Sequence, residues 1–420
     1  MKCKLKVKEI IGICICFAVI MNSCGKNSEK KIPTSQTETN ISSVKDSTEI
    51  SLPVLNVYVE NSGSMYGYVG AGNNSEFRNT VYNYLSDIES SITVSELNLN
   101  FINSDVIKEG SVIEDFVDKL EPKTFKVSGG NSGATDIAEI LVKVYPQDDT
   151  ISLLVSDCIF SPGRGKNASK YLVNQGIGIK SFLRKQHNFN STGMIVYRML
   201  GSFKGNYYDT IDNKRDFEGK RPYYLWLIGN VKDLQQIHNA TIGKMKSKPD
   251  EIYMISNGIK DIKYNIVAGG RYKPSHDASN TVENLKKTKT AQGELYQIKV
   301  KADFSNLLQC EEYLLDVSNY ETSNSKWKVS RVSKQSDTEY IITIESSVKQ
   351  RGDITIELKN IKPRWITELS DENGGFPNPD DTIQKTYGFS YLIEGLFDAY
   401  DVRSIDELWD IEDLKPLLCE

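Results

Sequence analysis

Short apolar runs alternate with longer segments of helical periodicity between residues 53 and 257. Five runs indicate strands that are covered on both faces, and they span residues 54–59, 97–102, 151–155, 194–197 and 223–228. Apolar residues recur every three or four positions in four other segments, at residues 76–92, 112–120, 136–144 and 168–185. This alternation predicts an α/β domain with a doubly wound, Rossmann-like and mostly parallel sheet.

Between residues 258 and 375 the apolar positions recur at every second residue instead. The alternating residues include Ile298, Val300, Ala302 and Phe304, then Trp327 and Val329, then Tyr340, Ile342 and Ile344, and finally Ile354, Ile356 and Leu358. Strands with one apolar and one polar face, separated by polar turns, predict a β-rich antiparallel sandwich or small barrel.

The last segment, residues 376–420, has helical spacing again. Its apolar residues include Phe389, Leu392, Leu396 and Tyr400, with Leu408 and Trp409 further on. We expect a helical C-terminal segment that packs on the sheet, with attachment to a partner as the alternative.

The first 23 residues have the pattern of an export signal. Four lysines, Lys2, Lys4, Lys6 and Lys8, precede an apolar run at residues 10–21, which is too short for a bilayer core that needs about 20 apolar residues. The run ends in Met21-Asn22-Ser23-Cys24-Gly25, which resembles a bacterial lipobox, with Met21 in place of the usual leucine.

The lipobox resemblance implies that the mature chain begins at Cys24, which would be acylated and inserted in a lipid bilayer. The protein would then lie in the cell envelope, outside the cytoplasm. An ordinary signal-peptidase site or an uncleaved anchor are the alternatives. Residues 24–52 carry very few apolar side chains, so they predict a flexible tether between the lipid and the first domain.

Composition narrows the range of partners and chemistries. Removing residues 1–23 takes away four Lys and one Glu, which moves the formal net charge from −5 to −8. An acidic mature chain argues against nucleic acid as a partner. Of the seven cysteines, only Cys158, Cys310 and Cys419 remain beyond the lipidation site, which is no disulfide framework.

Oxygen-bearing side chains follow two of the predicted strands, where α/β sheets bind their ligands. The first strand ends in Glu60-Asn61-Ser62-Gly63-Ser64, and the strand at 151–155 ends in Ser156-Asp157. A glycine-rich segment, Gly129 to Gly133, precedes Thr135 and the next helix. Hydroxyl and carboxylate oxygens suit a hard divalent cation such as Mg²⁺, Ca²⁺ or Mn²⁺.

These three segments together resemble a von Willebrand factor A (vWA) domain with its metal-ion-dependent adhesion site. The resemblance covers about half of the chain. It implies a divalent cation, with Mg²⁺ as first choice, held by Glu60, Ser62, Ser64, Thr135 and Asp157. It also implies a coordination position that a carboxylate of a partner protein fills. The family has Asp where this chain has Glu60, whose extra methylene could alter or abolish metal binding.

Three functions from different classes therefore remain. The first is a membrane-anchored module that binds a protein partner through the vWA-like site. The second is a structural or envelope-assembly lipoprotein whose site has lost its metal. The third is an unrecognised hydrolase, which we do not expect. His187, His238 and His276 stand beside no nucleophile motif, and no Gly-x-Ser-x-Gly elbow or phosphate-binding Gly-Lys-Ser/Thr loop is present.

Overall fold

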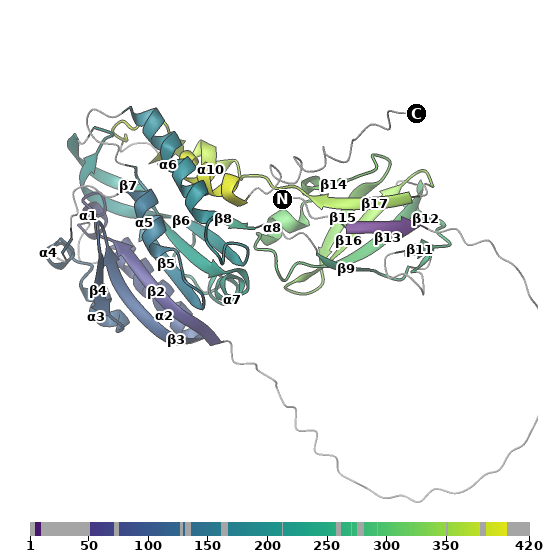
Figure 1. Ribbon diagram of the computed structural model, residues 1–420, viewed down its shortest axis with the longest axis horizontal. Coiled ribbons are helices and arrows are strands. Elements are labelled where there is room, and N and C mark those ends of the chain that lie inside the picture. Colours follow the sequence, from purple (N-terminus) through teal and green to yellow (C-terminus); the bar gives the residue numbers. More distant parts are fainter. Residues whose placement is uncertain are drawn as a thin grey trace, which may run out of the picture.

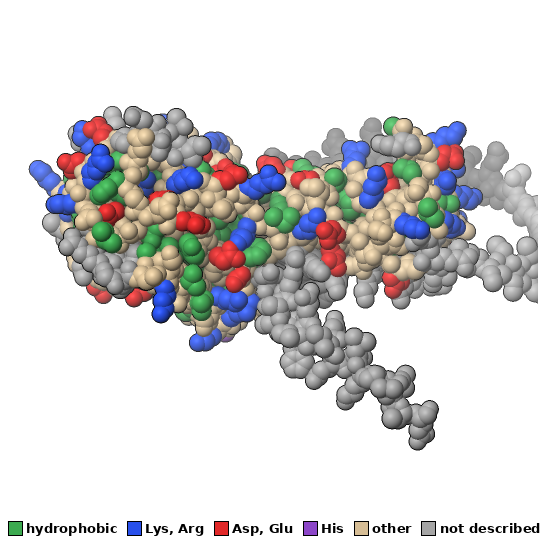
Figure 2. Space-filling model, turned by 90° about the horizontal axis from the view of Figure 1, so that it is seen from above, with side chains coloured by type: hydrophobic (Ala, Val, Ile, Leu, Met, Phe, Trp, Pro, Cys, Tyr) green, Lys and Arg blue, Asp and Glu red, His purple; other side chains and the backbone are tan. Residues whose placement is uncertain are grey.

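The computed structural model describes residues 5–9, 51–70, 75–126, 129–130, 136–160, 167–211, 213–257, 262–269, 271–274, 281–291, 293–349, 352–378 and 384–400. They form an α/β domain and a β-rich domain that lie side by side along the long axis of the molecule (Figure 1). Lys, Arg, Asp and Glu are interspersed over the face that Figure 2 shows, without a continuous patch of one sign.

A seven-stranded sheet forms the centre of the α/β domain, in the order β4-β3-β2-β5-β7-β6-β8. Its strands are β2 (Ser51–Glu60), β3 (Thr93–Ile102), β4 (Val106–Gly110), β5 (Thr150–Ser156), β6 (Thr192–Tyr208), β7 (Lys214–Asn230) and β8 (Glu251–Ser256). All five predicted apolar runs fall within these strands.

Among the described strands of this sheet, parallel pairing is confined to β2–β3 and β2–β5, so the prediction of a mostly parallel sheet is wrong for the remaining pairs. β6 and β7 form one antiparallel hairpin of 17 residue pairs, and β7 is antiparallel to β5. The connection between β6 and β7, residues 209–213, is too short for a crossover, which takes a dozen or more residues. The sheet is mixed, with a parallel core.

Helices cover both faces of this sheet (Figure 1). One face packs against α2 (Glu76–Ser91), α3 (Ile113–Asp118) and α7 (Val231–Thr241). The other packs against α5 (Ile137–Val144), α6 (Ala168–Leu183) and α10 (Phe389–Tyr400). Both clusters draw on alternate residues of the same strands, as Leu153 and Leu154 do on β5. The α/β class is thereby confirmed.

Helix α10 shows that the C-terminal segment packs on the α/β domain rather than on the β-rich domain that precedes it. The Phe389 ring stacks on Tyr224 of β7 with ring centroids 4.4 Å apart. α10 crosses α6 closely, because a Cβ at Gly395 would lie 2.5 Å from the Gly176 carbonyl oxygen. The predicted packing of this helix on the sheet is confirmed, while Leu408 and Trp409 lie outside the described residues.

The β-rich domain consists of two facing sheets around one apolar core. One contains β10 (Lys273–Pro274), β11 (Thr281–Glu283), β1 (Leu5–Glu9), β17 (Gly352–Leu358) and β14 (Tyr320–Thr322), in that order. The other contains β12 (Lys287–Thr290), β13 (Gly293–Asp303), β16 (Glu339–Ser346) and β15 (Lys328–Lys334), with β9 (Lys263–Ile266) also paired to β13. The predicted antiparallel β-rich region is confirmed.

One strand of this domain comes from the opposite end of the chain. β1 belongs to the segment with the pattern of an export signal, and it lies between β11 and β17 (Figure 1, purple strand among the green ones). Among the described residues, none of the helices has the length and apolar character needed to cross a membrane. Cys24 and the expected tether up to residue 50 lie outside the described residues.

Candidate functional site

The parallel pairing of β2 and β5 brings the two carboxylates of the expected site to one edge of the sheet. Val59 and Val155 are register partners, so Glu60 and Asp157 both follow the last paired positions of neighbouring strands. β3 runs alongside, and its Ile102 carbonyl accepts a hydrogen bond from the Asn61 amide at 3.0 Å. Sequence alone placed these groups at strand ends, and the sheet order makes them neighbours.

The Ser-Gly-Ser turn adds two hydroxyls to the carboxylates. Ser62 Oγ and Ser64 Oγ lie 2.9 Å apart. Burial raises the pKa of both carboxyl groups, and this rise is opposed by the Ser62 hydroxyl at Glu60 and by the Ser64 hydroxyl at Asp157. The structure thus gathers four of the five predicted residues, and the fifth, Thr135, lies outside the described residues.

Both carboxyl groups are buried, with exposed fractions of 5% for Glu60 and 2% for Asp157. Burial, followed by the nearby charge of Asp157, raises the pKa of Glu60 to about 8. Burial likewise raises the pKa of Asp157, against opposing effects of the Ser64 hydroxyl, the Ile159 amide and the Arg221 guanidinium. Two neighbouring buried carboxyl groups titrate as a pair, and the repulsion between their negative charges favours a state in which the pair keeps one proton.

One carboxylate oxygen in this pair has no hydrogen-bond partner among the described residues. Asp157 Oδ2 is buried and accepts no hydrogen bond from the described residues. Its counterpart on Glu60, Oε2, accepts a hydrogen bond of 2.5 Å from the Ser156 hydroxyl. A buried carboxylate oxygen without a hydrogen bond raises the free energy of the folded state, so a proton or a cation at this point would stabilise the fold.

Ser156 is a site residue that sequence reasoning missed. Its Oγ accepts the Cys158 amide proton at 2.9 Å, which leaves its own hydroxyl proton to donate to Glu60. Cys158 reaches this position with a φ of 56°, in the left-handed region. A serine at the end of a buried strand is a weak signal by itself, because only the neighbouring strand shows what its hydroxyl reaches.

Arg221 is the second missed residue. It lies on β7, it is 2% exposed, and its guanidinium carbon lies 4.7 Å from the centroid of the Tyr207 ring. Nη1 donates to the Lys385 carbonyl oxygen at 3.3 Å, while Nη2 is buried without a partner among the described residues. Its positive charge lowers the pKa of Asp157. Arg221 is therefore an internal countercharge for this carboxylate.

The start of the glycine-rich loop reaches the same edge of the sheet. Asn103 Nδ2 donates to Asn61 Oδ1 at 2.7 Å and to the Gly129 carbonyl oxygen at 2.9 Å. Gly130 has a φ of +69°, and a Cβ there would lie 2.0 Å from Asn103 Oδ1, so only glycine fits. The loop that leads to Thr135 therefore begins beside Asn61.

Asp136, next along the chain, has a different role from the four site residues. Its Oδ1 accepts the Ala138 amide at 2.9 Å and so caps α5. Its Oδ2 accepts hydrogen bonds from Tyr171 at 2.5 Å and Gln175 at 2.8 Å, both on α6. These contacts occupy the carboxylate, which leaves Glu60 and Asp157 as the acidic groups of the site.

The donor set suits a hard divalent cation better than a soft one. Two carboxyls and two hydroxyls offer oxygen only, which matches Mg²⁺ or Mn²⁺. In the part of the chain that the structure describes, no group of three or more His, Cys, Asp or Glu side chains is arranged so that it could hold a metal ion. A cation here would depend on hydroxyl oxygens as much as on charge.

The two described histidines lie away from this site. His187 Nε2 lies 2.7 Å from Asp148 Oδ2, and both side chains are largely exposed. His238 of α7 lies 2.9 Å from the Tyr197 hydroxyl, and burial lowers its pKa to about 4. Among the described residues, neither Ser62 nor Ser64 therefore forms a Ser–His pair.

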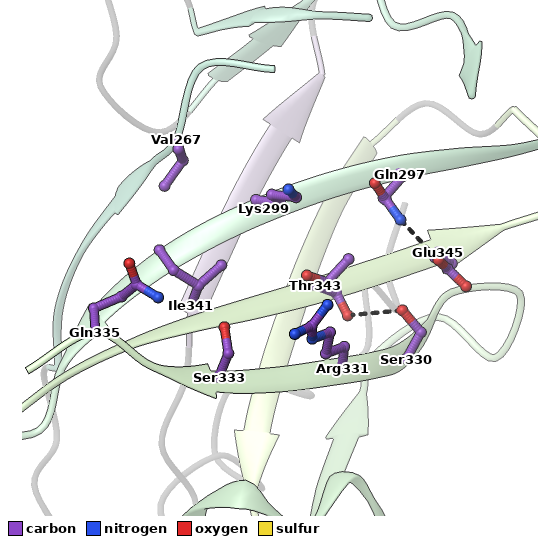
Figure 3. Close-up of a pocket in the computed structure, with 10 residues that line it drawn as sticks. All are labelled: Val267, Gln297, Lys299, Ser330, Arg331, Ser333, Gln335, Ile341, Thr343 and Glu345. Carbon is purple, nitrogen blue, oxygen red and sulfur yellow. Dashed lines mark hydrogen bonds between the residues drawn. The ribbon is translucent and has the colours of Figure 1, made fainter. Parts of the chain in front are cut away.

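A cavity of about 620 Å³ lies in the β-rich domain, on the polar outer face of the sheet that contains β13, β15 and β16 (Figure 3). Among its lining residues, Gln297 Nε2 donates to Glu345 Oε1 on the neighbouring strand at 2.8 Å, and Ser330 Oγ donates to the Thr343 carbonyl oxygen at 3.4 Å. The cavity is open and lies in the other domain, so it is not part of the carboxylate site.

Comparisons with protein-family models, with curated proteins and with solved structures find no match for this chain.

In metal-free protein, the stability that Glu60 contributes should decrease as the pH rises. Its pKa is about 8 in the fold and near 4.5 when unfolded, so the folded state holds the proton more tightly. Such a group contributes most below its unfolded pKa, and the contribution is lost as the pH rises through the folded pKa. Melting temperatures of wild type and Glu60→Gln in chelator should therefore converge at acid pH. Between pH 5 and pH 9 the melting temperature of the wild type should fall relative to that of the variant. Parallel curves of melting temperature against pH would contradict a raised pKa of Glu60.

Proposed function

We propose that this protein is a lipid-anchored, extracytoplasmic binding module that recognises a partner protein through a divalent cation. Glu60, Ser62, Ser64 and Asp157 would hold the cation, with Thr135 as a fifth ligand by resemblance to the vWA adhesion site. The bound cation would present an electrophilic position to a carboxylate of the partner.

The observation that carries this proposal is Asp157 Oδ2, a buried oxygen that accepts no hydrogen bond from the residues that the structure describes. It lies in a buried pair of carboxyls with two hydroxyls on the adjoining turn, at the carboxyl ends of parallel strands. A cation supplies both the missing contact and the missing charge. Capture of the partner from solubilised native envelopes, with Mg²⁺ and with chelator, tests the function. A partner recovered equally well with chelator would contradict a metal-dependent contact.

Membrane attachment through Cys24 rests on the lipobox-like sequence, and it has its own test. Cys24→Ala should move the protein out of the membrane fraction or accumulate an uncleaved precursor, because the acyl chains and the cleavage both depend on this thiol. Fractionation and intact-mass measurement check this outcome, with Cys310→Ala as the matched control. Normal processing and unchanged membrane attachment of Cys24→Ala would contradict the anchor.

Arg221 supports a second candidate function, a structural lipoprotein with a metal-free site. Its guanidinium already provides a positive charge near Asp157, and Glu60 can stay protonated because its pKa is raised. A protonated Glu60, together with the positive charge of Arg221 near Asp157, would need no metal. Failure of millimolar Mg²⁺ or Mn²⁺ to change the stability of the protein would favour this alternative.

A further inference from the structure

The position of β1 shows that the β-rich domain has room for one strand that the rest of the domain does not supply. β1 pairs with β17 over five residues, from Leu5 opposite Ile356 to Glu9 opposite Gly352, in antiparallel orientation. On its other side it pairs in parallel with β11, through Thr281 and Val282. Among the described strands, β11 is linked to β17 and β14 only through β1.

Export would remove this strand. If the chain is processed at Cys24, as the proposed function requires, residues 5–9 leave with the signal segment. β11 and β17 would then stand two strand spacings apart, or about 9.6 Å, which is too far for direct backbone pairing. Buried residues on both sides of the gap, Val282, Ile354 and Ile356, belong to the core of this domain. A gap of this kind exposes apolar side chains and two rows of unpaired backbone groups.

We infer that the gap between β11 and β17, the strand slot, is a docking site for an extended segment of another polypeptide, bound by strand addition. This inference rests on the proposed processing at Cys24. The added strand would run antiparallel to β17 and parallel to β11, as β1 does.

The segment that occupies the slot indicates the chemistry of the partner. Leu5-Lys6-Val7-Lys8 alternates apolar and basic residues, which suits a strand with one face on a core. The three strands β11, β17 and β14 carry only acidic charges, at Glu283, Asp353, Glu357 and Glu321. Asp353 is exposed and is the register partner of Lys8. A partner strand should therefore alternate apolar residues with lysine or arginine.

Residues 24–50 of the mature chain do not offer such a strand. They contain no stretch that alternates apolar and basic residues over five positions. Residues 401–420 concentrate their apolar side chains at helical spacing. A second polypeptide is therefore the occupant to which the inference commits.

The test uses the processed protein, extracted from membranes in mild detergent, and a fluorescent peptide with the sequence of residues 4–11. Binding should saturate at one peptide per chain and raise the melting temperature. A Val7→Pro peptide should bind at least tenfold more weakly, because proline cannot donate to the ladder. In the protein, Asp353→Lys should weaken binding several-fold. Glu357→Lys, on the same strand but beyond the last position paired with β1, should leave it unchanged.

The outcomes separate the two proposals. An intact mass that retains residues 1–23 would contradict the lipid anchor and leave the slot filled by the chain itself. A mass that begins at Cys24, together with no peptide binding, would overturn the docking site alone. If truncation after Tyr400 is needed for binding, the occupant is the C-terminal segment of this chain, and the assignment to a partner is wrong.

Discussion

Millimolar Mg²⁺ or Mn²⁺ should raise the melting temperature of the metal-free protein, and Asp157→Ala should abolish the rise. A ligand that binds only the folded state stabilises it by about 2.7 kcal/mol at a hundredfold excess over its Kd. For a domain of this size, that corresponds to roughly 5–10 °C. The effect should grow with pH, because the cation must displace the proton that the buried carboxyl pair favours keeping. Differential scanning calorimetry with and without chelator measures it.

Three variants make this experiment specific to the site. Asp136→Asn should lower the melting temperature, because the amide nitrogen that replaces one carboxylate oxygen cannot accept the hydrogen bonds from Tyr171 and Gln175. It should keep the α5 cap and the metal response. Glu60→Asp restores the family's residue and should preserve or tighten metal binding. Arg221→Gln removes the internal countercharge, so it should destabilise the metal-free form and increase the response to metal.

Each pattern of response assigns one function. A metal-induced rise in the melting temperature of the wild type that Asp157→Ala abolishes supports the metal-dependent binding module. A metal-induced rise in melting temperature that only Glu60→Asp shows would identify a degenerate site and favour the structural lipoprotein. If no variant responds at millimolar metal, the adhesion-site hypothesis is wrong.

Phe389→Ala should destabilise the α/β domain by about 3–5 kcal/mol, the usual cost of removing a buried aromatic ring. Phe389 is fully buried, and its ring stacks on Tyr224 and on Trp365, with centroid distances of 4.4 and 5.8 Å. The variant should lower the calorimetric transition of the α/β domain by roughly 10 °C and leave that of the β-rich domain in place.

The matched control for this prediction is Phe376→Ala. Phe376 is 36% exposed and has a single ring neighbour among the described aromatic pairs, Tyr207 at 6.1 Å, so its loss should cost under about 1 kcal/mol. A shift of the β-rich transition in Phe389→Ala would mean that α10 does not belong to the α/β domain.

Much of the candidate site could be predicted because it depends on local order along the chain. Glu60 and Asp157 lie at the ends of apolar runs. The helical segments and the strand at 97–102 between those runs leave enough chain for the crossovers that parallel strands need. Parallel strands place their carboxyl ends at one edge, so the carboxylates had to meet if the strands were neighbours. Ser156 and Arg221 could not be found this way, because their role depends on which strand lies next to theirs.

The sequence by itself determined the type and place of most elements and the change from α/β to β-rich character near residue 258. Periodicity records which faces of an element are buried, and that is a local property. It determined the strand over residues 223–228, for example, but not its direction.

Only the tertiary structure decided which buried faces meet. It decided that β6 and β7 form an antiparallel hairpin, which brings Arg221 towards Asp157. It decided that α10 crosses the chain to pack on α6, and that Leu5–Glu9 pairs with β17 about 350 positions away in sequence. The reason is that an apolar stripe or an unpaired strand edge gains free energy from any complementary neighbour. The choice among neighbours follows from shape and packing that no single segment contains.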